Sequence, residues 1–295
     1  MRTVRVTSRT VEAENVVSFV LSGEDLPRWE PGAHIDVEIT PGLVRQYSLC
    51  GHGTDWRIAV LREENGRGGS KHLHDHISAG DTLRVSEPRN NFPLMPAEKH
   101  IFVAGGIGIT PLLPMLAKAR DWTLYYGGRR RSRMAFLGEL SRYGDRVRVL
   151  PENEHGLLPL ADIFADSDAP VYCCGPEPLL AAAERLCPPE RLRVERFHAR
   201  EVAAEPARGF EVLASASGKT VRIGPGQSIL DALDLAGVPM PSSCREGTCG
   251  TCETPVLEGE VEHLDSVLSE QERQAGKTMM VCVSRARSDR LVLDI

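Results

Sequence analysis

The sequence predicts a multidomain chain of three units in order: an antiparallel β-barrel, an α/β domain with a doubly wound parallel sheet, and a small α+β domain. Its 295 residues exceed one compact core of ordinary size and suit two or three domains. Short alternating runs give way near residue 98 to alternating strand and helix patterns, and the charge and cysteine content change again after residue 210. We expect domains at 1–97, 98–202 and 211–295, with a linker at 203–210.

The first unit is predicted from short strand patterns. Runs such as 16–21 and 35–39 alternate apolar and polar side chains between Gly and Pro turns, which is typical of an antiparallel barrel or sandwich. One helical patch, 70–77, interrupts them.

The second and third units are predicted from a change in the spacing of apolar residues along the chain. Apolar runs at 101–104, 122–126, 147–150, 171–173 and 192–197 alternate with helical patterns, which predicts parallel strands with crossover helices. Strand patterns return at 210–214 and 221–223, followed by a helix at 228–236.

The composition indicates a globular protein outside the membrane. Hydrophobic residues make up 41% and charged residues 26% of the chain. The longest uncharged stretch, 101–117, is just short of a membrane span and is broken by glycines and prolines. The N-terminus has no apolar segment of a secretory signal, so we expect a cytoplasmic protein whose eight cysteines serve a purpose other than disulfides.

Negative charge is concentrated in the last third of the chain. Residues 211–295 hold 13 Asp and Glu against 8 Lys and Arg, a net of −5 within a total of −6. Nucleic-acid binding needs clustered Lys and Arg, so this balance opposes it and favours docking on a basic partner protein. A solvated acidic surface is the alternative.

Four cysteines in this third, Cys244, Cys249, Cys252 and Cys282, have the spacing Cys-x4-Cys-x2-Cys with a distant fourth Cys. This is the plant-type ligand pattern of a 2Fe-2S cluster. Small Ser, Gly and Thr neighbours let the loop curl and aim N–H groups at the sulfurs. Zinc is the alternative, although its sites usually pair ligands in two short Cys-x-x-Cys knuckles.

Two barrel segments can cradle a phosphorylated ring cofactor. Residues 45–49, Arg-Gln-Tyr-Ser-Leu, end a strand, and residues 66–70, Gly-Arg-Gly-Gly-Ser, open the helical patch. A cation, an aromatic ring and a hydroxyl then face backbone N–H groups at a helix start. In the alternative interpretation, Tyr47 belongs to the core and the glycines form a turn.

A glycine-rich loop in the second unit favours a nicotinamide dinucleotide. Residues 105–110 follow a strand, and their glycines have no side chains to keep the backbone away from a pyrophosphate. Pro111 is expected at the first position of a helix. Pro111 stands where the Rossmann fingerprint has its third glycine. Arginines at 129–131 and 133 follow the next strand, where they could meet the 2′-phosphate of NADPH or form a solvated face.

Taken together, segments 45–48, 66–70, 105–111 and 173–176 resemble the motifs of the ferredoxin-NADP reductase superfamily in their usual order. With the cysteine-rich C-terminal module, the whole chain resembles the phthalate dioxygenase reductase family. That resemblance implies a flavin barrel, an NAD domain and a β-grasp ferredoxin domain with plant-type cluster ligands.

The resemblance also implies residue roles. Ser48, Cys174 and Glu195 would lie at the reacting atoms, with the Ser48 hydroxyl near the hydride-accepting nitrogen of the flavin. Residues implied to hold the flavin are Arg45, Gln46, Tyr47, Ser48, Ile58, Ala59, Val60, Gly68, Gly69, Ser70, Lys71, Thr110 and Phe197. Residues implied to hold the dinucleotide are Gly105, Gly106, Gly108, Ile109, Thr110, Pro111, Arg129, Cys174, Gly175 and Pro176. In the alternative interpretation, Cys173 and Cys174 are small apolar residues that end a buried strand. We interpret Cys50 and Cys187 as structural.

The resulting hypothesis is a monomeric reductase that passes electrons from NADH through FMN and the cluster to a Rieske-type aromatic-ring oxygenase or O-demethylase. The family typically uses FMN where the wider superfamily uses FAD, and no aromatic residue at 63–65 is placed to stack an adenine. NADPH stays open beside NADH because of the arginines. Two rival functions are a stand-alone oxidoreductase acting on a small substrate and a redox-sensing protein without enzymatic activity.

Overall fold

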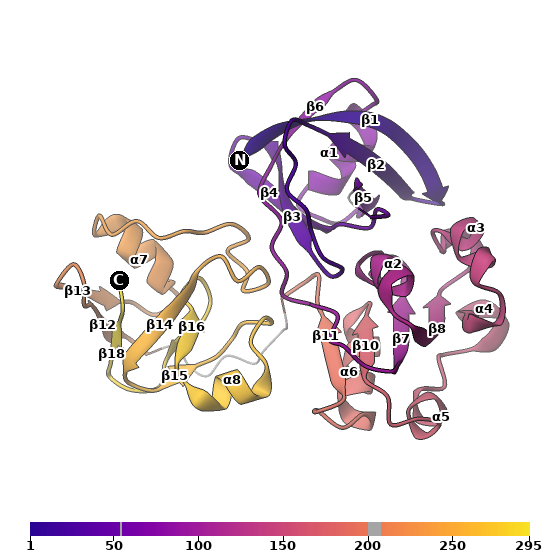
Figure 1. Ribbon diagram of the computed structural model, residues 1–295. Coiled ribbons are helices and arrows are strands. Elements are labelled where there is room, and N and C mark those ends of the chain that lie inside the picture. Colours follow the sequence, from indigo (N-terminus) through magenta and orange to yellow (C-terminus); the bar gives the residue numbers. More distant parts are fainter. Residues whose placement is uncertain (54, 200–207) are drawn as a thin grey trace. The chain divides into compact units, whose positions relative to one another are not determined.

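The computed structural model describes residues 1–53, 55–199 and 208–295. It divides into two compact units, Met1–Glu195 and Arg196–Ile295, which are described separately (Figure 1). Most of the predicted linker, 203–207, lies outside the described residues. None of the described helices combines the length and apolar character needed to cross a membrane.

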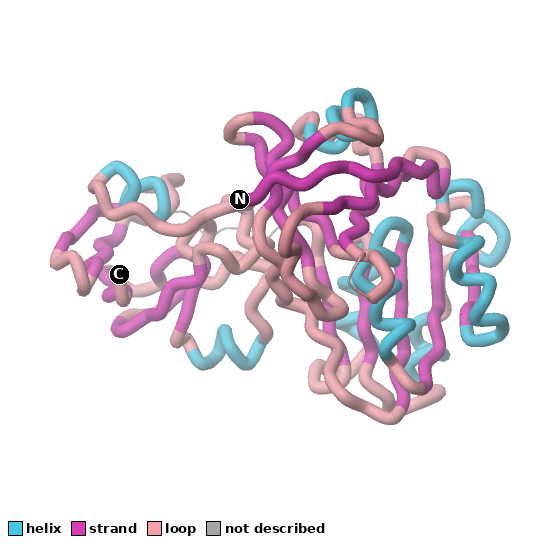
Figure 2. Tube along the Cα trace, turned by 45° about the horizontal axis from the view of Figure 1, so that its top comes forward, coloured by secondary structure: helices cyan, strands magenta, loops and turns pink. Residues whose placement is uncertain are grey.

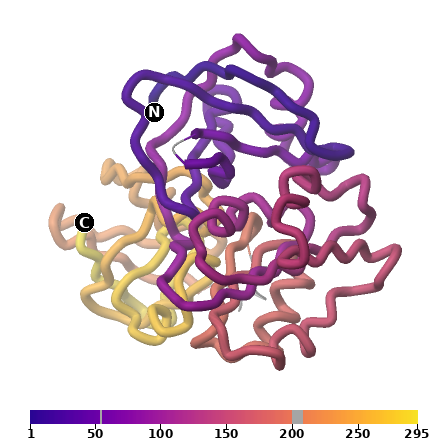
Figure 3. Tube along the Cα trace, turned by 45° about the vertical axis from the view of Figure 1, so that its right-hand side comes forward, coloured from indigo at the N-terminus to yellow at the C-terminus, as the bar shows by residue number. Residues whose placement is uncertain are grey.

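A six-stranded antiparallel sheet forms the N-terminal part of the first unit, as predicted. Its strands are β1 (Arg2–Ala13), β2 (Val16–Ser22), β3 (His34–Thr40), β4 (Leu43–Ser48), β5 (Trp56–Leu61) and β6 (Thr82–Val85). Their order is β4-β3-β6-β1-β2-β5, and an antiparallel bridge between Leu49 and Ile58 joins the two outer strands. The sheet is thereby closed into a barrel, and β1 and β2 form its long hairpin (Figure 3).

The barrel core follows the two-residue period of its strands. Phe19, Ile35 and Ile58 are completely buried in it, and Leu73 of helix α1 (Gly69–His76) packs on the same cluster. Helix α1 begins one residue before the predicted patch and follows Gly68, whose φ of 88° suits glycine.

A five-stranded parallel sheet makes up the rest of the first unit. Its strands, in the order β11-β10-β7-β8-β9, are β7 (Lys99–Gly105), β8 (Asp121–Gly128), β9 (Val147–Pro151), β10 (Val171–Cys174) and β11 (Leu192–Glu195). The helices between them are α2 (Ile109–Lys118), α3 (Leu137–Leu140), α4 (Glu152–His155), α5 (Leu160–Ala165) and α6 (Glu177–Leu186), with 3-10 turns η1 (Gly106–Gly108), η2 (Arg131–Arg133) and η3 (Ser141–Arg146). All four strand pairs are parallel, which confirms the predicted doubly wound domain (Figure 2).

The two faces of this sheet have different partners. Ile101 and Val103 of β7 belong to a cluster with α5 and α6, whereas Phe102 and Ala104 face α2. The α2 cluster also contains barrel residues, among them Val16, Cys50, Ala59 and Phe92. The barrel and the parallel sheet therefore share this apolar cluster, besides the separate clusters of the barrel and of the opposite sheet face.

Helix α2 corrects one prediction. Pro111 occupies its third position rather than its first, because a 3-10 turn precedes the helix and the helix begins at Ile109. Proline is accommodated there because the first backbone N–H groups of a helix have no partner within it.

The C-terminal unit is a mixed α+β structure. Its strands are β12 (Phe210–Ala214), β13 (Lys219–Ile223), β14 (Glu253–Glu258), β15 (Val261–Glu262), β16 (Thr278–Met280), β17 (Arg285–Ala286) and β18 (Arg290–Leu293), and its helices are α7 (Ile229–Leu235) and α8 (Glu270–Ala275). The main sheet has the order β13-β12-β18-β14-β16, with β12 and β18 parallel and the other pairs antiparallel. Strand β12 begins at Phe210, one residue before the start that we expect for this domain.

Candidate functional site

Strand β4 and the N-terminus of α1 are brought together at the barrel surface. A Cβ atom at Gly69 would lie 2.8 Å from Cγ of Arg45 and 3.3 Å from its Nε, so the arginine stem packs directly on this glycine. The position of a Cβ atom at Gly68 is open. The structure thus places a cation beside the start of α1, as the cradle hypothesis requires.

The next two residues of α1 are held by a neighbouring loop. The Ser70 hydroxyl accepts a hydrogen bond from the Glu63 N–H at 3.0 Å, and Lys71 Nζ lies 3.3 Å from Glu64 Oε2. Both contacts are on exposed groups. The loop at 63–64 therefore fixes the region that sequence analysis assigned to phosphate.

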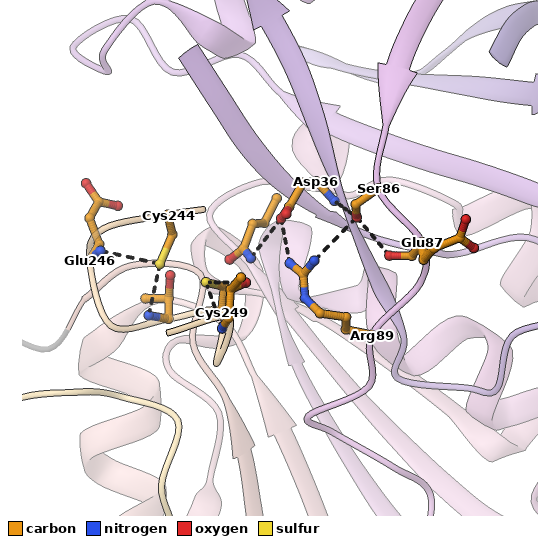
Figure 4. Close-up of polar contacts among 10 residues, drawn as sticks. Asp36, Ser86, Glu87, Arg89, Cys244, Glu246 and Cys249 are labelled. Carbon is orange, nitrogen blue, oxygen red and sulfur yellow. Dashed lines mark hydrogen bonds and ion pairs between the residues drawn. The ribbon is translucent and has the colours of Figure 1, made fainter. Parts of the chain in front are cut away.

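Gln46 points to a polar network that sequence analysis missed. Its amide donates to Asp36 Oδ1 at 3.1 Å, and Arg89 donates to the same oxygen at 2.7 Å (Figure 4). Asp36 is buried, and its N–H donates to the Ser86 hydroxyl. Asp36 stands in an alternating strand pattern, where an acidic residue gives no sign that it will be buried and ion-paired.

The remaining predicted flavin contacts differ in burial, and those on β5 are buried. Ile58 and Val60 belong to the barrel core, and Ala59 belongs to the core shared with the parallel sheet. Tyr47 packs against the barrel core while staying partly exposed, and burial raises the pKa of its phenol. Phe197 lies in the other compact unit, with 36% of its surface exposed.

The glycine loop after β7 and the turn after β10 lie in close contact. A Cβ atom at Gly108 would lie 2.2 Å from the carbonyl oxygen of Cys174, and one at Gly105 would lie 2.7 Å from Pro176 Cδ. The parallel pairing of Ala104 with Cys174 brings the two loops to the same edge of the sheet. The two loops approach so closely that Gly105 and Gly108 have no room for a side chain, which explains why both positions are glycine.

Gly106 and the start of α2 complete this edge. Gly106 has a φ of 55°, in the left-handed region, and the position of its Cβ is open. Ile109 and Thr110 are buried, and the Thr110 hydroxyl donates to the Ile107 carbonyl at 3.0 Å.

Ser48 and Glu195 meet although 147 residues separate them. The Ser48 hydroxyl lies 3.4 Å from Glu195 Oε2, and burial raises the pKa of this carboxyl group to about 8. Cys174 is completely buried, and burial together with the nearby Glu195 and Cys173 raises the pKa of its thiol well above the ordinary value. The barrel and the parallel sheet thus each contribute a group to one place, and the carboxyl group is predominantly neutral at pH 7.

The arginines after β8 differ in their partners. Arg131 lies 2.9 Å from Glu154, and Arg133 lies 3.0 Å from Glu14 on the barrel. The Arg129 carbonyl accepts a long hydrogen bond of 3.4 Å from the Asn153 N–H. Two of the arginines are therefore already matched by carboxylates.

The four C-terminal cysteines gather around one loop. Cys249, Cys252 and Cys282 are buried, and Cys244 is partly exposed. Backbone N–H groups of Glu246 and Thr248 point at the Cys244 sulfur at 3.3 and 3.5 Å, and that of Thr251 points at the Cys249 sulfur at 3.4 Å (Figure 4). The eight cysteines, all of them described, form no disulfide.

The sulfur chemistry of this loop suits an iron-sulfur cluster. Backbone N–H groups directed at the Cys244 and Cys249 sulfurs stabilise negative charge there, and the thiolate is the form in which cysteine binds metal. No described group of three or more His, Cys, Asp or Glu side chains converges on a single ion. A two-iron cluster shares its four ligands between two metal atoms, so the donor set fits that group.

Comparisons with known proteins agree with these features. Residues 213–287 match the family model described as a 2Fe-2S iron-sulfur cluster binding domain. The chain is 41% identical to phenoxybenzoate dioxygenase subunit beta of Ectopseudomonas oleovorans, over 99% of this chain and 97% of that protein.

Solved structures also match along the whole chain. Phthalate dioxygenase reductase aligns with a TM-score of 0.70 and 37% identity, over 100% of this chain and 98% of that one. An intact type IV self-sufficient cytochrome P450 monooxygenase aligns with a TM-score of 0.92 and 43% identity, and the chain spans only 41% of its length. The chain therefore belongs to the phthalate dioxygenase reductase-like family, whose members are the reductase components of oxygenase systems and carry electrons from NAD(P)H through a flavin and a 2Fe-2S cluster to an oxygenase component.

Proposed function

We propose that this reductase oxidises NADH, uses FMN as its flavin, and delivers electrons through its cluster to a Rieske-type aromatic-ring oxygenase or O-demethylase. The observation that carries the proposal is the contact between Ser48 and Glu195. It joins the strand expected to hold the flavin with the strand end expected to meet the nicotinamide. A redox-sensing protein without enzymatic activity would have no need for such a joint site.

The barrel residues bind and orient the flavin in this proposal. The Arg45 guanidinium, Gly68 and the α1 residues Gly69, Ser70 and Lys71 hold its phosphate, since a helix N-terminus and nearby cations favour an anion. Within the first unit, the residues proposed to line the ring are Gln46, Tyr47, Ser48, Thr110 and the strand 58–60. When bound, the flavin accepts two electrons at once from a nicotinamide and can release them singly.

The residues at the sheet edge orient the nicotinamide dinucleotide. Its pyrophosphate would lie along Gly105, Gly106, Gly108, Ile109, Thr110 and Pro111, and its nicotinamide beside Cys174, Gly175 and Pro176. Glu195, neutral over much of the physiological range, accepts a hydrogen bond from the Ser48 hydroxyl. A neutral pair avoids a buried negative charge next to electron-rich rings.

NADH is proposed over NADPH because of the ion pairs that follow β8. Glu154 and Glu14 hold Arg131 and Arg133, which reduces the positive charge available to a 2′-phosphate. Arg129 is proposed to contact the adenosine part of either dinucleotide.

Cys244, Cys249, Cys252 and Cys282 are proposed as the cluster ligands. The N–H groups that surround their sulfurs stabilise the negative charge that a thiolate-bound cluster carries. The acidic C-terminal domain is proposed to dock a single copy of this chain on a basic surface of the oxygenase. The protein is proposed to work in the cytoplasm, where its free cysteines would stay reduced.

One set of measurements tests this function. Purified protein should show flavin and iron-sulfur absorption that bleaches on addition of NADH under anaerobic conditions, and denaturation should release FMN. Release of FAD would overturn the flavin assignment alone. A spectrum that NADH does not change would overturn the reductase function, and iron-free protein with bound zinc would overturn the cluster.

A further inference from the structure

A buried carboxylate, Asp265, connects the two chain segments that carry the cluster cysteines. Its side chain is completely shielded from solvent. Oδ2 accepts hydrogen bonds from the N–H groups of Val267 and Leu268 at 3.1 and 2.8 Å, which fixes the turn that follows. Asp265 lies outside the Cys-x4-Cys-x2-Cys motif, and nothing in the sequence pattern marks it.

The first connection is to the loop between Cys244 and Cys249. Gly247, in the left-handed region with a φ of 70°, packs so closely that a Cβ atom there would lie 3.0 Å from Asp265 Cα and 3.3 Å from its Cβ. The N–H of Ser266 also donates to the Gly247 carbonyl at 2.8 Å. The residue that bears the carboxylate therefore abuts the cluster loop.

The second connection is to the turn that carries Cys282. The Ser284 hydroxyl, two residues beyond this cysteine, lies 3.5 Å from Asp265 Oδ1 and accepts from the Leu264 N–H at 3.3 Å. Ser284 is itself buried. Asp265 thus contacts both ligand-bearing segments, the cluster loop through its Cα and Cβ atoms and the Cys282 turn through its carboxylate.

Two basic side chains face the carboxylate. Arg273 of α8 donates to the Asp265 carbonyl at 2.6 Å and has its guanidinium 3.8 Å from Oδ2, and His263 Nδ1 lies 3.7 Å from Oδ1. Although burial acts against it, the adjacent His263 and the N–H of Leu268 hold the pKa of Asp265 below its ordinary value. The site is therefore a buried charge held by hydrogen bonds and two basic side chains, in surroundings where electrostatic interactions are poorly screened.

We propose that Asp265 is a positioning residue that holds the cluster loop against the Cys282 turn and that its negative charge sets the cluster's reduction potential. Reduction adds an electron to the cluster, and a buried negative charge nearby opposes that addition. The positive charge of Arg273 favours the addition of the electron. The proposal rests on the four cysteines being the cluster ligands. It adds that the residues around them control the reduction potential of the cluster.

The test uses the full-length, cluster-loaded protein and potentiometric titration of the cluster, followed by electron paramagnetic resonance. Asp265→Asn keeps the shape and removes the charge, so its midpoint potential should shift positively. Arg273→Gln should shift it negatively. Asp289→Asn, the same charge change at a fully exposed position of this domain, is the matched control and should leave the potential unchanged.

Opposite shifts distinguish electrostatic control from a purely structural role, which would lower cluster content or stability without reversing the sign. Unchanged potentials and spectra in both variants would overturn the proposal. If Asp265→Asn does not retain its cluster, the proposal is tested by Arg273→Gln alone. An unchanged or raised midpoint potential in Arg273→Gln would contradict the proposal. Wild-type protein without iron would instead mean that the cluster assignment itself has failed.

Discussion

The two redox sites of this chain are built in different ways. The expected hydride-transfer site lies in the unit Met1–Glu195, where it combines Ser48 of the barrel with Glu195 of the parallel sheet. The cysteine cluster lies in Arg196–Ile295, and three of its four ligands come from nine consecutive residues. One site depends on long-range packing and the other mostly on local chain geometry, so different changes should break them.

The largest expected effect separates the two sites completely. Cys249→Ser removes one cluster ligand and should abolish reduction of cytochrome c, a one-electron acceptor. NADH oxidation with an artificial two-electron acceptor should stay within about twofold of wild type, because the first unit contributes no ligand to the cluster. Cys187→Ser, a buried cysteine remote in sequence from the motif, is the control. Equal loss of both activities in folded, flavin-bearing Cys249→Ser protein would contradict the independence of the hydride-transfer site from the cluster.

A substitution at the loop crossing should damage the first unit instead. Gly108→Ala places a methyl group 2.2 Å from the Cys174 carbonyl oxygen, so the two loops must separate. We expect a destabilisation of about 1–3 kcal/mol and reduced affinity for NADH, with the cluster spectrum retained. Urea unfolding followed by tryptophan fluorescence measures the stability. Gly138→Ala, where a Cβ atom meets open space, should cause no such loss.

A pH series sharpens the role of the long-range pair. The pKa of Glu195 is raised from 4.5 to about 8, so the folded state binds its proton more tightly than the unfolded state. The resulting stabilisation is full below pH 4.5, is lost as the pH rises towards 8, and is constant above. Thermal unfolding of wild type relative to Glu195→Gln should show this decline, since glutamine does not titrate.

The same variant gives a kinetic readout. Flavin reduction by NADH in wild type should change in rate across pH 8, and Glu195→Gln should lose that dependence. Ser48→Ala serves as a second variant, because it removes the hydroxyl that lowers the pKa of Glu195 and should move the transition to higher pH. An identical pH profile of the flavin-reduction rate in wild type and Glu195→Gln would show that the Glu195 carboxyl group does not cause the pH dependence.

A smaller effect concerns the choice of dinucleotide. Glu154→Gln releases Arg131 from its ion pair, so the ratio of kcat/KM for NADPH to that for NADH should rise several-fold. Tighter binding of 2′-AMP relative to 5′-AMP, measured by calorimetry, should accompany it. Glu152→Gln removes a charge on the same helix and serves as the control. An unchanged ratio would show that these arginines do not meet a 2′-phosphate.

The smallest expected effect is on partner docking. If the acidic C-terminal domain steers association, electron transfer to the oxygenase should slow as ionic strength rises, whereas flavin reduction by NADH should be nearly unaffected. Stopped-flow kinetics at a series of salt concentrations measures both steps. Turnover that is insensitive to salt would remove the steering role.

The sequence predicts the cluster motif and most strands well because both are local. Ligand spacing within a nine-residue loop and the two-residue alternation of β12 are properties of short chain segments. The start of α2 was misplaced at Pro111, because the 3-10 turn that precedes the helix depends on Gly106 and on the loop that it faces.

What the sequence by itself determined was the order of three domains, the cysteine pattern and the motifs that carry the family resemblance. Only the tertiary structure decided that Gly108 is required by the Cys174 turn, that Asp36 and Asp265 are buried, and that Ser48 meets Glu195. The physical reason is that local periodicity reports which face of an element is apolar. The partner of a polar group comes from whichever distant segment the shared core brings beside it.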